Sequence, residues 1–160
     1  MTAPEDPTGH RSPQQRVGDG STRVLIVDDL VDIRYLLRLN LEHRGFVVTE
    51  APDPEVARAR AALEPPDGII MDLDIPGFDA VGAVRGLRDL VPQAGILVIS
   101  ASPQQEDVAI GALAAGADAY FDKTGGFDAL VGRLSALLAG PARDGPQASR
   151  PRLPPERAGA

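Results

Sequence analysis

The chain has 160 residues, a formal net charge of −7 and 43% apolar residues, which suits one domain with a single core. Cysteine is absent, so disulfides and thiolate metal sites are excluded, as fits a reducing cytoplasm. No apolar run approaches the roughly 18 residues that a membrane span needs, and the start of the chain lacks the pattern of a secretory signal. We therefore expect a soluble, cytoplasmic protein without membrane contacts.

Charge and proline are distributed unevenly along the chain. Residues 23–139 carry 10 basic and 18 acidic groups, and such an acidic body lacks the basic face that DNA phosphates require, so no direct DNA binding is expected. Residues 1–22 and 140–160 together hold 8 of the 15 prolines and show no periodic apolar pattern. We predict a disordered arm over 1–22, one ordered domain over 23–139, and a disordered tail rich in proline and arginine over 140–160.

Short apolar runs alternate with helical patterns through the predicted domain. Three or four consecutive apolar residues without alternation are typical of strands that are covered on both faces. These runs lie at residues 24–27, 46–48, 68–71, 96–99 and 119–121. Five β–α units with right-handed crossovers follow from this order. We predict an α/β fold of the flavodoxin type, a doubly wound sheet of five parallel strands in the order 2-1-3-4-5 with five helices.

The predicted helices carry start and stop signals. The first helix should end before Gly45, and Asp53-Pro54 should begin the second as N-cap and first helical residue. The helix at 81–91 is predicted to be weak because it contains two glycines. Residues 102–105 fit a capping box for the fourth helix, which Gly116 should end.

Four of the five predicted strands end in chemically reactive residues. The first strand is followed by Asp28 and Asp29, the third by Asp72, the fourth by Ser100 and the fifth by Lys123. Doubly wound folds bind ligands at the carboxyl ends of their strands. Three carboxylates gathered there repel one another, and Mg²⁺ relieves the repulsion while keeping sites for water and a phosphate oxygen. The cluster therefore predicts a magnesium site that a phosphoryl group completes.

Lys123 is the single lysine of a chain that has fifteen arginines. Its ammonium is a compact point charge that suits one phosphoryl oxygen. A carboxylate beside the cation can accept a phosphoryl group as an acyl phosphate, and Lys123 would neutralise charge during in-line transfer. Taken alone, Asp29 is better interpreted as a helix N-cap and Ser100 as a loop hydroxyl. Their conjunction is what indicates phosphoryl chemistry.

Four segments resemble the receiver domain of bacterial two-component response regulators. They are Arg23–Asp29, Ile70–Gly77, Val98–Ala101 and Gly116–Lys123, and the resemblance covers residues 23–139. Thr124 departs from the family pattern, in which proline often follows the lysine, and none of the departures removes a reactive group.

The resemblance implies a role for each matching residue. Asp72 would be the phosphoacceptor, and Lys123 would contact the phosphoryl group. Ser100 and Tyr120 would be the hydroxyl and aromatic switch residues. The implied Mg²⁺ ligands are the side chains of Asp28, Asp29 and Asp72 and the backbone carbonyl of Asp74.

The resemblance also implies a function, that of a stand-alone, single-domain response regulator similar to chemotaxis regulators. A sensor histidine kinase or histidine phosphotransfer protein would phosphorylate Asp72, and phosphorylation would alter binding to a downstream target protein, which the sequence does not identify. The 21 residues after position 139 are too few and too polar for an output domain. Such a protein is not an enzyme toward other substrates, because it catalyses only its own phosphorylation and dephosphorylation.

Two alternatives remain open on the sequence. A pseudo-receiver would keep the fold as a scaffold without phosphate chemistry. A phosphatase similar to haloacid dehalogenases would use Asp72 and Asp74 as nucleophile and acid/base pair. That class keeps its further acidic pair after the lysine, whereas Asp28 and Asp29 precede Lys123 here.

Overall fold

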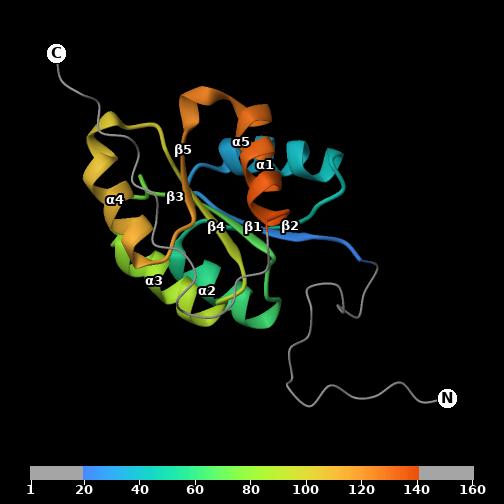
Figure 1. Cartoon of the computed structure of the whole chain (residues 1–160), viewed down its shortest axis with the longest axis horizontal. Coiled ribbons are helices and arrows are strands. Elements are labelled where there is room, and N and C mark those ends of the chain that lie inside the picture. The colour runs from blue at the N-terminus through green and yellow to red at the C-terminus, as the bar shows by residue number, and fades with distance from the viewer. Residues whose placement is uncertain (1–19, 141–160) are drawn as a thin grey trace.

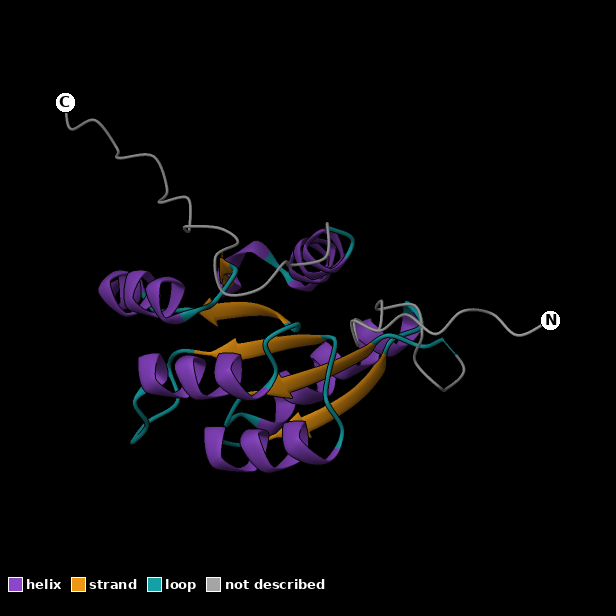
Figure 2. Cartoon of the chain, turned by 60° about the horizontal axis from the view of Figure 1, so that its bottom comes forward, coloured by secondary structure: helices purple, strands orange, loops and turns teal. Residues whose placement is uncertain are grey.

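The computed structural model describes residues 20–140, which form a five-stranded parallel sheet between two layers of helices (Figures 1 and 2). The strand order is β2-β1-β3-β4-β5, which confirms the predicted fold. The strands are β1 (Arg23–Val27), β2 (Val47–Ala51), β3 (Gly68–Asp72), β4 (Gly95–Ser100) and β5 (Ala119–Asp122). The helices are α1 (Val31–His43), α2 (Pro54–Leu63), α3 (Ala80–Leu90), α4 (Glu106–Ala115) and α5 (Phe127–Leu138). The predicted disordered arms, 1–22 and 140–160, lie outside the described part except for residues 20–22 and 140.

Two apolar clusters hold the helices to the sheet. Helices α2, α3 and α4 cover one face, where Ala57, Val84 and Ala112 pack with every second residue of the central strands. Helices α1 and α5 cover the other face through residues that include Leu41 and Leu134. Burial on both faces explains why the central strands appear in the sequence as unbroken apolar runs. None of the helices within residues 20–140 combines the length and the apolar character that crossing a bilayer requires.

Strand β2 was predicted at 46–48, but it spans Val47–Ala51. Thr49 and Glu50 continue the parallel pairing with β1, where they lie beside Leu25 and Ile26. Because their side chains are polar, this half of the strand does not belong to an apolar run. Polar residues are tolerated because β2 is an edge strand of the sheet.

Most of the predicted helix ends are confirmed. The side chain of Asp53 accepts a hydrogen bond from the Val56 amide at 2.9 Å, and Gly45 and Gly116 adopt positive φ values of 87° and 127° after α1 and α4. The capping box at 102–105 is wrong. The Ser102 side chain makes no cap hydrogen bond, and residues Pro103–Gln105 form a 3₁₀ turn before α4.

Helix α3 forms in spite of its glycines. The side chain of Asp79 caps it by accepting a hydrogen bond from the Gly82 amide at 3.1 Å, and its buried residues Val84 and Leu87 pack on the sheet. Tertiary burial thus outweighs the weak helix propensity of the glycines.

Candidate functional site

The register of the sheet brings the ends of four strands to one edge. Val27 lies beside Met71, Asp72 lies beside Ile99, and Ser100 lies beside Asp122. The residues that directly follow β1 and β5 therefore reach the same edge as the last residues of β3 and β4. The predicted convergence of the reactive residues is a consequence of this parallel register.

Asp28, directly after β1, is fully buried. Its Oδ1 accepts a hydrogen bond from the Leu30 amide at 2.9 Å, and this bond turns the chain from the strand into α1. The N-cap of α1 is Leu30, without a side-chain cap bond. The interpretation of Asp29 as the helix N-cap is therefore wrong, and its exposed carboxylate stays available at the rim of the site.

Arg34 on α1 supports this turn, a role that the sequence pattern did not indicate. Its Nη1 donates a hydrogen bond to the backbone carbonyl of Asp28 at 2.6 Å. Its Nε lies 3.4 Å from Glu50 Oε1 on β2. Arg34 lies one turn into α1, and this position could have indicated a contact with the strand ends. An arginine on an amphipathic helix more often faces solvent, so the position alone does not predict the contact.

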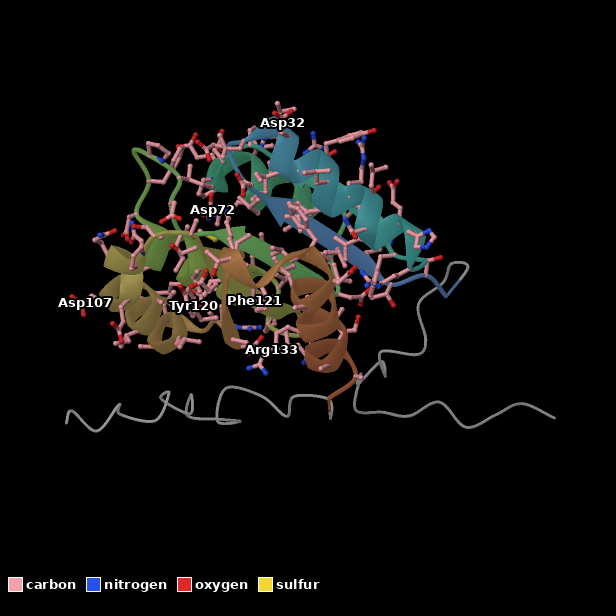
Figure 3. All side chains as sticks on the ribbon, turned by 90° about the horizontal axis from the view of Figure 1, so that it is seen from above. Asp32, Asp72, Asp107, Tyr120, Phe121 and Arg133 are labelled. Carbon is pink, nitrogen blue, oxygen red and sulfur yellow. The ribbon has the colours of Figure 1, made fainter. Side chains whose placement is uncertain are left out.

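Asp72, the last residue of β3, has only 2% of its surface exposed. Its Oδ1 accepts a hydrogen bond from the Asp74 amide at 2.9 Å, and its Oδ2 lies 3.1 Å from Lys123 Nζ. Figure 3 shows Asp72 among the side chains at this edge of the sheet. The carboxylate is thus held on both oxygens.

Lys123 follows β5 and joins the two buried carboxylates. Its Nζ lies 3.0 Å from Asp28 Oδ2 and 3.1 Å from Asp72 Oδ2, and its side chain is 17% exposed. One ammonium group therefore neutralises part of the charge of two aspartates. The sequence predicted Lys123 near Asp72 as a contact for the phosphoryl group, and the ion pair with Asp28 was not predicted.

Burial and charge alter the protonation of this cluster. Burial is the largest influence on Asp72 and, with a smaller contribution from Asp28, raises its pKa to about 6 in spite of the Asp74 amide and Lys123. Burial alone lowers the pKa of Lys123, but Asp72 and Asp28 more than offset it, so its pKa lies above the ordinary value. These shifts favour the cationic form of Lys123 and, in the metal-free protein, the protonated form of Asp72.

The acidic cluster has the composition of a divalent cation site. One carboxylate oxygen from each of Asp28, Asp29 and Asp72 can be chosen so that all three lie within 4.8 Å of one another. Carboxylate oxygens are the ligands that Mg²⁺ prefers, and three of them leave room for water or phosphate. Because Lys123 supplies a single positive charge for these aspartates, a bound cation would further relieve their repulsion.

Ser100, the last residue of β4, is fully buried, and its hydroxyl contacts Asp74. It lies 3.0 Å and 2.9 Å from the two carboxylate oxygens of Asp74. The same carboxylate accepts a hydrogen bond from the Ala101 amide at 3.0 Å. The resemblance to receiver domains implied a role for the backbone carbonyl of Asp74 but none for its carboxylate.

Tyr120 on β5 is half-buried and packs against the apolar cluster between the sheet and helices α2, α3 and α4. Burial raises the pKa of its hydroxyl above the ordinary value, and the negative charges of Asp122, Asp74 and Glu106 act in the same direction. Figure 3 labels Tyr120 on the side of the molecule that carries α4. The role of Tyr120 as the aromatic switch stays a prediction.

Comparisons with known proteins agree with this geometry. Residues 24–135 match the response regulator receiver domain family. The transcriptional regulatory protein KdpE of Mycobacterium tuberculosis is 39% identical over 117 residues, which are 73% of this chain and 51% of that protein. The chain thus spans about half the length of the curated relatives it matches.

Solved structures show the same fold. A two-component response regulator of the LuxR family from Aurantimonas has a TM-score of 0.69 and 33% identity, covering 76% of this chain and 88% of that chain. A response regulator from Burkholderia pseudomallei has a TM-score of 0.66 and 28% identity, covering 71% and 66%. With the strand order and the sequence match, these likenesses establish that the chain belongs to the response regulator receiver domain family.

Proposed function

We propose that this receiver domain accepts a phosphoryl group on Asp72 and signals through phosphorylation-dependent contact with a partner protein. The observation that carries the proposal is the bridge made by Lys123, whose Nζ lies 3.0 Å from Asp28 and 3.1 Å from Asp72. It places a cation and a second carboxylate beside Asp72, the proposed nucleophile. The structure from Burkholderia pseudomallei, described with a phosphorylated aspartic acid and a calcium ion, supports the same chemistry for a relative.

Phosphohistidine on a sensor kinase or phosphotransfer protein is the proposed donor. A carboxylate oxygen of Asp72 attacks phosphorus, the nitrogen–phosphorus bond breaks, and its electron pair remains on the imidazole. Lys123 lies 3.1 Å from Asp72, and its ammonium group can stabilise the negative charge that develops on the phosphoryl oxygens. Hydrolysis by water later returns Asp72 and inorganic phosphate. The domain therefore catalyses only its own phosphorylation and dephosphorylation.

The proposed cofactor is Mg²⁺, held by Asp28, Asp29 and Asp72 together with the backbone carbonyl of Asp74. When bound, Mg²⁺ supplies charge neutralisation for the transferred phosphoryl group. The three side chains are the acidic cluster whose oxygens lie within 4.8 Å of one another. Asp28 contributes in a second way, because its bond to the Leu30 amide fixes the turn that presents Asp29.

The signal is proposed to pass through Ser100 and Tyr120 to α4, β5 and α5. Ser100 would donate to a phosphoryl oxygen, and Tyr120 would then move toward the space that the hydroxyl leaves. Phosphorylation acts as a population shift, because it stabilises the conformation in which these contacts form. The partner of the altered face is proposed to be a protein, since residues 23–139 are acidic and poorly suited to DNA.

A labelling experiment tests the proposal. The purified chain is incubated with acetyl phosphate and Mg²⁺ and its intact mass is measured, with Asp72→Asn as the control. We expect one phosphoryl group on the wild type and none on the variant. A wild type that stays unlabelled would favour the scaffold alternative. Multiple turnovers of an aryl phosphate would favour the phosphatase alternative.

A further inference from the structure

Asp74 is placed between the proposed phosphoacceptor and the proposed switch hydroxyl. Its backbone amide donates to Asp72 Oδ1 at 2.9 Å. Its carboxylate lies 2.9 Å and 3.0 Å from Ser100 Oγ and accepts from the Ala101 amide at 3.0 Å. One residue thus connects the end of β3 to the end of β4 and to the loop that follows β4.

The two groups that Asp74 engages are the donors at the end of β4. A hydroxyl and an amide each have one proton to donate. While Ser100 and Ala101 donate to the Asp74 carboxylate, they cannot donate fully to a phosphoryl group on Asp72. Hydrogen bonds to a charged acceptor are stronger than those between neutral groups, so the carboxylate competes effectively with an incoming phosphoryl oxygen.

Ser100 does not depend on Asp74 to satisfy its hydroxyl. Its Oγ also lies 3.4 Å from the carbonyl of Ser102 and accepts a hydrogen bond from the Ser102 amide at 3.1 Å. The buried hydroxyl therefore retains polar neighbours when Asp74 releases it, and the cost of leaving it unpaired is small. Because Ser102 can replace Asp74 as the polar partner of Ser100, the contact between Ser100 and Asp74 suits a switch better than a role in fold stability.

On the basis of the proposed function, we propose that the Asp74 side chain is a positioning residue that keeps Ser100 and Ala101 turned away from Asp72 in the unphosphorylated state. Phosphorylation must break these contacts before the two donors reach the phosphoryl group. Asp74 thereby lowers the population of the active conformation, and its loss raises that population.

The test measures the affinity for beryllofluoride, a mimic of the phosphoryl group, in saturating Mg²⁺. Wild type, Asp74→Ala, Ser100→Ala and the double variant are titrated by isothermal calorimetry. Asp74→Ala keeps the backbone carbonyl and should bind about tenfold more tightly, the size expected for releasing charge-assisted hydrogen bonds. In the Ser100→Ala background the same substitution should gain about threefold or less, because only the Ala101 contact remains to be released.

Two further variants make the result specific. Asp74→Asn is nearly isosteric and removes the charge while keeping one acceptor oxygen, so its affinity should fall between wild type and Asp74→Ala. Glu106→Gln removes a negative charge near Tyr120 without touching Ser100 and should leave the affinity unchanged. Thermal unfolding of each variant verifies that it is folded, and Mg²⁺ titrations verify that the cation site is saturated.

The outcomes separate this proposal from the proposed function. Wild-type binding with an unchanged or weakened Asp74→Ala variant overturns the positioning role and leaves phosphorylation standing. An equal gain in the Ser100→Ala background also overturns it, because removal of charge alone would then explain the effect. A wild type that binds no beryllofluoride, and is not labelled by acetyl phosphate, overturns both.

Discussion

Lys123 and Asp28 lie 95 residues apart in the sequence, yet they form an ion pair of 3.0 Å in which the Asp28 side chain is fully buried. Burying a carboxylate is unfavourable unless a charge or hydrogen bonds compensate for the loss of water. The lysine therefore has a structural role in addition to the chemical one. Its removal has consequences for stability that can be measured without any phosphodonor.

Replacement of Lys123 by methionine should destabilise the metal-free protein. Two buried aspartates would lose the cation that lies between them, and breaking a buried pair in this way costs about 3 kcal/mol. Urea unfolding in EDTA measures the loss. Lys123→Arg is the control, because it keeps the charge and should lose less. An unchanged free energy of unfolding for Lys123→Met in EDTA would contradict the electrostatic account of the cluster.

Asp72 should make the metal-free protein less stable as the pH rises. Its folded pKa of about 6 lies above the ordinary value of 3.8, so the folded state holds the proton more tightly than the unfolded state. Stability from this group is complete below the unfolded pKa and is lost as the pH rises through about 6. Between about pH 5 and pH 7 the loss should amount to about 1 kcal/mol.

Asp72→Asn provides the comparison for this pH dependence, because both proteins share every other titrating group. Urea unfolding in EDTA should show the variant gaining about 1 kcal/mol relative to wild type over the same interval. A difference between the two proteins that stays constant with pH would mean that Asp72 titrates at its ordinary pKa.

Arg88 should stabilise the opposite end of the sheet. Its guanidinium lies 2.8 Å from the carboxylate of Asp118, which also accepts from the Ile96 amide at 2.8 Å. It donates further hydrogen bonds to the backbone carbonyls of Pro92, Ala94 and Gly116. Lysine cannot reproduce this fork, so Arg88→Lys should cost about 2 kcal/mol of unfolding free energy.

The same helix supplies a matched control for Arg88. Arg85 lies on the exposed side of α3, and Arg85→Lys should change stability by less than about 0.5 kcal/mol. Denaturant unfolding of the two variants decides the prediction, and equal losses would argue against the role of the Arg88 network.

Phosphorylation should change the backbone amide chemical shifts at Ser100 and Tyr120. The physical reason is that Ser100 must exchange its contact with Asp74, 2.9 Å away at its nearest oxygen, for one with the phosphoryl group. Tyr120 then adjusts to the new position of the hydroxyl. Two-dimensional NMR with and without the phosphodonor measures the shifts. Changes limited to residues beside Asp72 would count against the switch.

The site was predictable where strand ends alone fix the position of a residue. Asp28, Asp72 and Lys123 follow directly from apolar runs and from the parallel order of the strands, because the carboxyl ends of those strands share one edge. The start of α2 at Asp53 was predictable because it depends on a local hydrogen bond. The end of α1 near Gly45 was predictable because it depends on a local backbone conformation.

The sequence did not predict side-chain contacts that depend on the conformation of a loop. The spacing of Asp72 and Asp74 does not indicate that the second carboxylate turns to Ser100, because its direction depends on the chain path after β3. Aspartate is a residue type that N-caps favour, so Asp29 was a reasonable candidate. The hydrogen bond from the Leu30 amide to the Asp28 side chain instead places the N-cap at Leu30, one residue later. Both cases depend on the local backbone conformation of a loop, which a periodic sequence pattern does not predict.

The central claim is tested most directly by locating the phosphoryl group. Borohydride reduces an acyl phosphate on aspartate to homoserine, which leaves a permanent mark after the chain is treated with acetyl phosphate and Mg²⁺ and digested. The account predicts homoserine at position 72 alone, and none when Mg²⁺ is replaced by EDTA. Homoserine at another aspartate, or an unmodified Asp72 in protein that is folded and saturated with Mg²⁺, would contradict it.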